Sequence, residues 1–130
     1  MSKGISSRNS EVIHAGLYYP NNSLKSKLCS IGNKSLYRYC KDNNVPVNKC
    51  GKLIVGTSDE QWSHLNKIKT YANDNGIIDL KWLSQQEVKV LESEIKCTHA
   101  LFSPSTGVID SYAFMLSLLS DSKKYDAELG

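Results

Sequence analysis

Apolar residues recur at a helical spacing along residues 24–42, directly after a serine that suits the start of a helix. The repeating positions are Leu24, Leu28, Ile31, Leu36, Tyr39 and Cys40, which fall close to a period of 3.6 residues. Ser23 is a favourable N-cap, and the polar run Asp42-Asn43-Asn44 is typical of a helix end. The pattern therefore predicts a helix over 24–42.

Three further helices are predicted from capping residues that precede apolar runs. Ser58-Asp59-Glu60 opens a helix that Asn75-Gly76 closes, because that pair tolerates the left-handed conformation of a helix end. Ser84, with Glu87 three residues later, forms a capping box for a short helix over 85–91. Asp110 or Ser111 starts the last helix, whose apolar pattern fades after Ser120.

Short β-branched and apolar runs between these helices predict strands. Pro46 makes residues 45–47 extended, and residues 52–57 (KLIVGT) form a strand after a turn or bulge at Cys50-Gly51. Further strands are expected at 79–82, 98–103 and 108–109, with a turn at 104–107. Residues 1–22 are rich in turn-forming residues and predict a loop with one helical turn over 11–14. Strands separated by helices indicate an α+β fold with a mixed or antiparallel sheet, and a mixed sheet is the expected form.

Composition narrows the classes of function. The chain has 130 residues and a net charge of +3, and its sixteen Lys and Arg residues are dispersed, which argues against a nucleic-acid-binding protein. No window of eighteen apolar residues exists, so we expect no transmembrane segment. A cytoplasmic location is expected, with peripheral attachment at the inner face of the membrane as an open alternative. Cys29, Cys40, Cys50 and Cys97 match no metal-ligand spacing, and we expect reduced, structural thiols and no metal site.

A cluster of small hydrogen-bonding residues stands near the start of the chain. It comprises Ser6, Ser7, Arg8, Asn9 and Ser10. Hydroxyls, backbone N–H groups and a guanidinium can hold a phosphate-bearing or dinucleotide ligand, and His14 follows them closely. The same composition also suits a solvated N-terminal tail, so both interpretations stay open.

Two other positions carry open alternatives. Lys52, at the start of a strand, can bind a substrate anion or can be an exposed lysine that discourages pairing at a sheet edge. The SPSTG turn at 103–107 can receive a ligand, although turn chemistry alone explains its proline, serine and glycine. The chain contains no glycine-rich phosphate loop of the GxGxxG or Walker A type.

Three segments in this order resemble a known family. They are SSRNSEVIHAGLYYP at 6–20, CGKLIVGT at 50–57 and SPSTGVIDSYAFMLSLL at 103–119. Together they closely resemble the FAD-dependent D-amino-acid-oxidase-like superfamily, and within it the L-2-hydroxyglutarate oxidase or dehydrogenase branch. The resemblance covers the chain from Gly4 to about Leu119.

The resemblance implies a division of the chain and roles for its candidate residues. Residues 1–44 would be a partial FAD-binding region, 45–103 part of the substrate-binding domain of a glutathione-reductase-like flavoenzyme, and 104–130 a segment and helix returning to the FAD domain. It implies that Ser6, Ser7, Arg8, Asn9 and Ser10 line FAD and that His14 is the catalytic base or stands beside the flavin. Tyr18 and Lys52 would contact a small 2-hydroxy acid, which loses a proton to a base and a hydride to the flavin.

The chain departs from the family pattern in one important respect. The GxGxxG turn and the acidic ribose contact, which supply most of the adenosine-side binding, are missing. We therefore expect an internal fragment of a larger enzyme that binds FAD weakly or not at all alone, and that a separate polypeptide supplying the GxGxxG portion would complete. A non-catalytic remnant or interaction module is the alternative, and a small autonomous ligand-binding domain is a third possibility.

Overall fold

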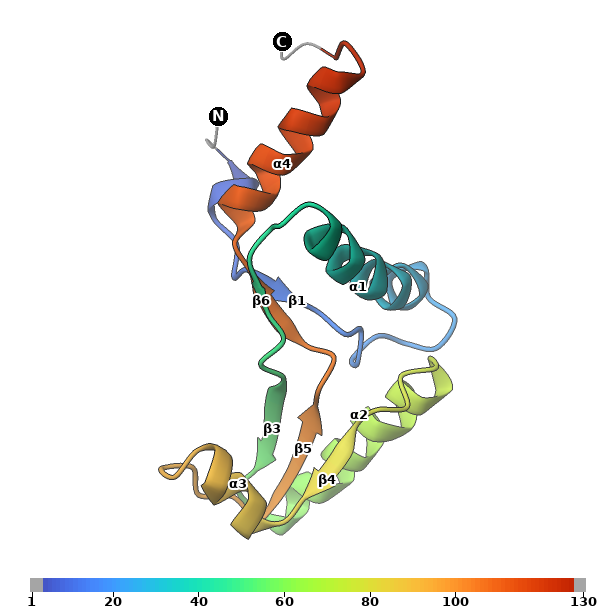
Figure 1. Ribbon diagram of the computed structural model, residues 1–130. Coiled ribbons are helices and arrows are strands. Elements are labelled where there is room, and N and C mark those ends of the chain that lie inside the picture. Colours follow the sequence, from blue (N-terminus) through green and yellow to red (C-terminus); the bar gives the residue numbers. More distant parts are fainter. Residues whose placement is uncertain (1–3, 128–130) are drawn as a thin grey trace.

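The computed structural model describes residues 4–127 as two small sheets with helices packed around them, in an elongated arrangement (Figure 1). The α-helices of this part are α1 (Leu24–Asp42), α2 (Trp62–Asp74), α3 (Gln85–Leu91) and α4 (Ser111–Lys124), with short 3-10 helices η1 (Ile5–Ser7) and η2 (Asp59–Gln61). Helix α1 lies beside the first sheet, α2 and α3 lie beside the second, and α4 projects away from both. The predicted helices at 24–42 and 85–91 are thus confirmed at both ends.

Both sheets are wholly antiparallel. The first has the order β1 (Val12–Ile13), β6 (Gly107–Ile109), β2 (Val47–Asn48), and the second has the order β3 (Lys52–Gly56), β5 (His99–Ser103), β4 (Lys81–Leu83). In register, Val12 faces Val108 and Leu53 faces Phe102. The α+β class is confirmed, and the expectation of a mixed sheet is wrong because every neighbouring pair runs in opposite directions.

One kinked two-stranded ribbon runs through both sheets, since β2 and β3 follow one another on one side and β5 and β6 on the other (Figure 1). The kink lies at Gly51, whose φ of +78° is a conformation that glycine adopts without strain. A Cβ at Gly51 would run into the Phe102 ring. The Gly51 N–H donates to the Thr106 carbonyl at 2.9 Å, and this hydrogen bond joins the two sides of the ribbon at the kink. The turn or bulge predicted at Cys50-Gly51 thus corresponds to a break between β2 and β3.

The buried apolar residues form two clusters, one for each sheet. The cluster at the second sheet comprises Ala15, Leu17, Leu65, Ile68, Ala72, Ile77, Leu80 and Leu101. The cluster at the first sheet comprises Ile13, Cys40, Val45 and Ile109. The short segment from Ile13 to Leu17 contributes to both clusters, so this part of the predicted N-terminal loop is firmly packed.

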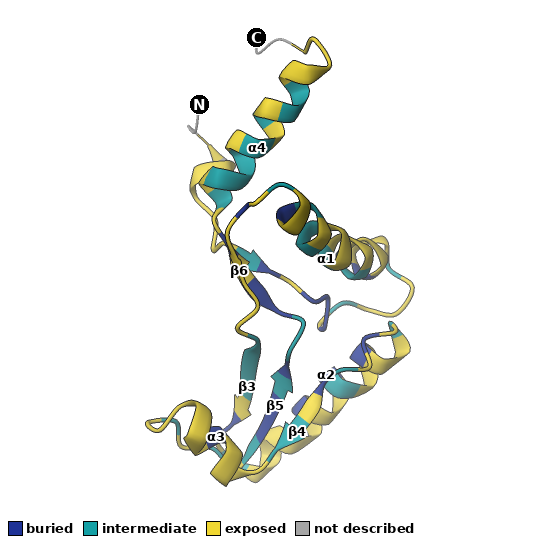
Figure 2. Ribbon diagram, viewed as in Figure 1, coloured by how far each residue is buried: buried dark blue, intermediate teal, exposed yellow. Residues whose placement is uncertain are grey.

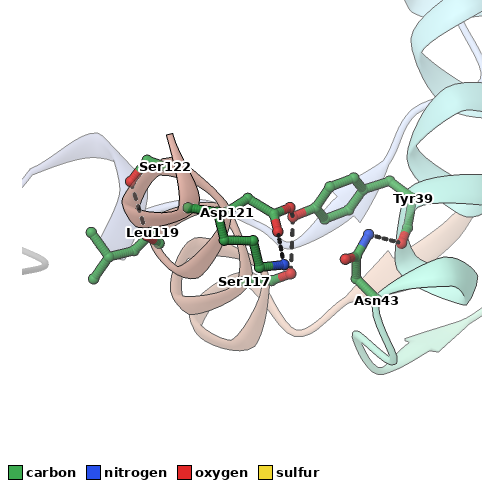
Figure 3. Close-up of polar contacts among 7 residues, drawn as sticks. Tyr39, Asn43, Ser117, Leu119, Asp121 and Ser122 are labelled. Carbon is green, nitrogen blue, oxygen red and sulfur yellow. Dashed lines mark hydrogen bonds and ion pairs between the residues drawn. The ribbon is translucent and has the colours of Figure 1, made fainter. Parts of the chain in front are cut away.

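Helix α4 is attached to α1 by a polar network around Tyr39 (Figure 3). The Tyr39 hydroxyl donates to Asp121 Oδ2 at 2.7 Å and lies 2.9 Å from Ser117 Oγ, while Lys124 donates to the other Asp121 oxygen at 2.8 Å. The Tyr39 ring also meets Phe114 edge to face, with centroids 5.6 Å apart. These contacts explain why α4 continues to Lys124 although the apolar pattern fades after Ser120.

Three local predictions need correction. Residues 11–14 form no helical turn, because Glu11 has a φ of +56° and the next two residues pair with β6. The Ser58 side chain caps no helix; a 3-10 turn follows it and α2 begins at Trp62. The strand expected at 79–82 lies at Lys81–Leu83 instead. The cysteines are all free thiols, as expected.

Candidate functional site

The structure brings His14, Tyr18 and Lys52 together around one shallow hollow. Residues 14–19, Lys52 and Thr106 line it. The Lys52 ammonium lies 4.9 Å from the centroid of the Tyr18 ring, a cation–π contact that joins the start of β3 to the N-terminal segment. Strand β3 is also an edge strand of its sheet, so both interpretations of Lys52, a ligand for an anion and a lysine at a sheet edge, stay open.

Asn33 of α1 holds the segment that carries His14. Its side-chain amide donates to the His14 carbonyl at 3.2 Å and to the Ser105 carbonyl at 3.0 Å. One side chain thus links α1, the chain after β1 and the SPSTG turn. Sequence reasoning missed Asn33, because an asparagine within a predicted helix carries no signal for partners nineteen and seventy-two residues away.

The SPSTG turn contributes Thr106 to the wall of the hollow. The hydroxyls of Ser103 and Thr106 are buried and lie 3.0 Å apart, so each satisfies the other. Turn chemistry had explained this segment without a ligand, and the role of Thr106 as a lining residue was therefore missed. Its position follows from the bond between the Thr106 carbonyl and Gly51.

This hollow is one wall of a site and not an enclosed pocket. Its volume is about 10 Å³, which is room for about one water molecule. His14 is exposed, and 44% of the Tyr18 surface is accessible. A ligand of several heavy atoms would therefore lie over these side chains, with its other side covered by something else.

The cluster at residues 6–10 is exposed and is separated from His14 by β1. Asn9 is engaged locally, since its amide donates to the Ser6 carbonyl and its oxygen accepts the Glu11 N–H at 2.8 Å. Ser7 donates to the Gly4 carbonyl. Within residues 4–127, the side chains of Ser6, Arg8 and Ser10 make no such bonds, so two hydroxyls and a guanidinium remain to bind an anion.

This donor set suits the phosphates of FAD, the cofactor that the resemblance implies. A guanidinium and hydroxyls on an exposed segment match phosphate oxygens. Between this cluster and His14 lie Glu11, with its left-handed φ of +56°, and the two-residue strand β1. The polar cluster and the histidine thus flank one short strand.

The described part of the chain holds neither a metal cluster nor a membrane-spanning helix. No group of three or more His, Cys, Asp and Glu side chains could hold a metal ion there. None of the helices between residues 4 and 127 has both the length and the apolar character needed to cross a bilayer.

Comparisons with known proteins identify relatives along nearly the whole chain. The model of the family described as FAD dependent oxidoreductase (DAO) matches residues 1–129. The chain is 44% identical over 117 residues to L-2-hydroxyglutarate dehydrogenase, mitochondrial, of Arabidopsis thaliana, covering 90% of this chain and 24% of that protein. It is 36% identical over 113 residues to the Homo sapiens protein of the same name, covering 87% and 24%. The chain thus spans about a quarter of the length of these curated relatives.

Solved structures agree in fold. L-alpha-glycerophosphate oxidase from Mycoplasma pneumoniae with FAD bound superposes with a TM-score of 0.77 at 25% identity, over 89% of this chain and 32% of that one. L-proline dehydrogenase from P. horikoshii gives a TM-score of 0.79 at 16% identity, over 95% and 33%, which shows the fold alone. The chain belongs to the DAO family of FAD-dependent oxidoreductases and is related within it to the L-2-hydroxyglutarate dehydrogenases.

Proposed function

We propose that this chain forms the flavin-side wall and part of the substrate-binding region of an FAD-dependent oxidoreductase acting on a small 2-hydroxy acid of the L-2-hydroxyglutarate type. One observation carries the proposal: His14, Tyr18 and Lys52 line one hollow, directly after the strand β1 that follows the polar cluster at residues 6–10. The names of the relatives supply the substrate class.

Each residue of the wall has a chemical task. The Lys52 ammonium attracts a substrate carboxylate, and the Tyr18 ring beneath it fixes the position of the charge. His14 accepts the proton of the substrate hydroxyl, because a neutral imidazole is a base near neutral pH. Asn33 holds the His14 backbone against the SPSTG turn and so acts as a positioning residue. When bound, FAD supplies the oxidant.

The other end of the segment holds the phosphates. Arg8 would pair with them through its guanidinium, and the hydroxyls of Ser6 and Ser10 would donate to their oxygens. Ser7 and Asn9 shape the turn that presents these donors, through their bonds to the Gly4 and Ser6 carbonyls.

Protein outside the residues of this chain completes the enzyme in this proposal. The chain has no GxGxxG turn, and its hollow is too shallow to enclose a substrate. The protein that binds the adenosine end of FAD would also cover the open side of the His14 wall. Without it, we expect weak FAD binding or none.

Gel filtration with FAD tests the proposal, first with the chain alone and then with a polypeptide that carries the GxGxxG region of a relative. Flavin absorbance that co-elutes with the pair and bleaches on addition of L-2-hydroxyglutarate supports the enzyme. Loss of flavin in both settings, with a folded chain, would leave the non-catalytic remnant as the better description. Cell fractionation with an antibody to the chain tests the remaining proposal of a cytoplasmic location, with peripheral attachment to the inner face of the membrane as its alternative.

A further inference from the structure

Helix α1 presents its most apolar side to solvent. Leu24, Leu28 and Ile31 are 72%, 58% and 63% exposed, although they belong to the periodic pattern that predicted the helix. The opposite side of the helix buries Ser26 and Cys40. Figure 2 shows exposed residues along much of the α1 ribbon. A soluble helix normally turns its apolar stripe inward, so this reversed arrangement marks a surface built for a partner.

The three exposed side chains form a narrow seam. Their spacing of four and three residues is that of successive core positions in a coiled coil. At 3.6 residues per turn they span an arc of about 60°. A helix that faces a protein core has an apolar stripe about 100° wide or more, and a strict a/d stripe is narrower, so this seam fits the side of a single other helix.

The charged side chains that flank the seam are positive. Lys25, Lys27 and Lys34 flank it, and residues 12–41 contain no Asp or Glu at all. None of these lysines takes part in an ion pair within the described residues, although Lys25 lies over the Tyr19 ring. If two copies of this chain paired through the seam, the lysines of one copy would face those of the other. A second copy is therefore disfavoured as the partner.

We propose that this seam, Leu24, Leu28 and Ile31 with its flanking lysines, docks an amphipathic helix of another polypeptide that carries Glu or Asp beside its own apolar seam. Leucine-type side chains of the partner would pack between the three apolar residues. The carboxylates would meet Lys25, Lys27 and Lys34 at the rim, where they set orientation and partner choice. This inference uses α1 alone and holds whether or not the chain contributes to an enzyme.

Fluorescence anisotropy with labelled peptides tests the docking on the full chain. The probe is a four-heptad peptide with leucine at its a and d positions and glutamate at its e and g positions. The matched peptide has lysine at e and g. We expect the glutamate peptide to bind and the lysine peptide to bind at least about tenfold more weakly, with affinity falling as salt is added.

Substitutions in the seam give the second part of the test. Leu28→Ser should weaken binding of the glutamate peptide by about tenfold or more, because a buried leucine contact is lost. Val90→Ser, at a 79% exposed position on α3, is the matched control and should leave binding unchanged. Both side chains are exposed, so circular dichroism should show the same fold for both variants.

Three results would overturn the proposal. They are equal binding of the two peptides, unchanged binding by the Leu28→Ser chain, and Leu28-dependent association with itself or with phosphatidylserine vesicles in place of peptide binding. Sedimentation velocity and vesicle co-sedimentation supply the last measurement.

Discussion

A lysine ammonium placed on an aromatic face is held in position while its charge stays available. Lys52 is in this state, since its stem is half-buried at the start of β3 and its head lies over Tyr18. The described residues supply it with no carboxylate partner. A lysine so arranged can bind an incoming anion without first breaking an ion pair.

Replacing this lysine should affect substrate binding more than turnover. In the enzyme completed with the adenosine-binding polypeptide, Lys52→Met should raise KM for L-2-hydroxyglutarate by about tenfold to a hundredfold, because one charge-assisted hydrogen bond is lost. Steady-state kinetics measure this effect, and Lys67→Met, at an exposed position of α2, is the control. An unchanged KM would remove Lys52 from the site.

His14→Ala should affect turnover more than substrate binding in the same assay. The proposed base is lost, so kcat should fall by about a hundredfold or more while flavin absorbance is retained. His64→Ala, an exposed histidine on α2, is the control and should behave as the native chain. A native kcat for His14→Ala would assign the proton transfer to another group.

The Asp121 carboxylate makes the stability of the fold depend on pH. Its hydrogen bonds from Lys124 and Tyr39 hold the pKa of Asp121 below its ordinary value of 3.8. The folded chain thus binds this proton less tightly than the unfolded chain, and the stabilisation is present above the ordinary pKa and is lost as pH falls through the lowered one. In urea titrations, stability should therefore fall more steeply below about pH 4 for the native chain than for Asp121→Asn. Asp126→Asn is the control, and parallel curves for native and Asp121→Asn chains would contradict this account.

At the scale of elements, close packing between α1 and the first sheet depends on a glycine. A Cβ at Gly107 of β6 would overlap the Tyr37 hydroxyl and the Asn48 carbonyl. Gly107→Ala should therefore lower the free energy of unfolding by about 1–3 kcal/mol. Gly32→Ala, inside α1 with open space around the new methyl group, should raise it by about 0.5–1 kcal/mol. Urea denaturation measures both, and equal effects would show that the overlap is relieved at no cost.

The elements that sequence predicted correctly are those with local causes. Helix α3 begins directly after Ser84 because Ser84 and Glu87 cap each other, with bonds of 2.7 Å and 3.3 Å that involve only neighbours in the chain. Strand β1 was missed because its partner β6 lies almost a hundred residues away and only tertiary structure supplies the pairing. The solvent exposure of the apolar side of α1 was not predicted either, since periodicity locates an apolar stripe on a helix but does not say what covers it.

The candidate site, too, could be predicted from the sequence only in part. Each of His14, Tyr18 and Lys52 was named from the sequence, but the contact of Lys52 with Tyr18 arises from the packing of β3 against the N-terminal segment. Their proposed roles, and the three-part division of the chain, stay predictions. Asn33 and Thr106 show that residues which position a site can leave no local pattern at all.

At the scale of the whole molecule, the ribbon and the 13–17 segment couple the two clusters. Leu101, fully buried in the central strand of the second sheet, belongs to one of them. Leu101→Ala should lower the free energy of unfolding by about 2–5 kcal/mol. Because of the coupling, Trp fluorescence from the second sheet and far-UV circular dichroism should shift to lower urea together. A shift in fluorescence alone would mean that the two halves unfold independently.

The central positions of β5 and β6 affect how the protein folds while it is being synthesised. These strands occupy the middle of their two sheets, and β1, β2, β3 and β4 are the outer strands that flank them. During synthesis, the outer strands are made before the central ones, so the second sheet cannot assemble until Ser103 has left the ribosomal exit tunnel and the first cannot assemble until Ile109 has done so. Until that moment the nascent chain holds its outer strands unpaired, and a pause in translation just before His99 would prolong its exposure to chaperones and to aggregation.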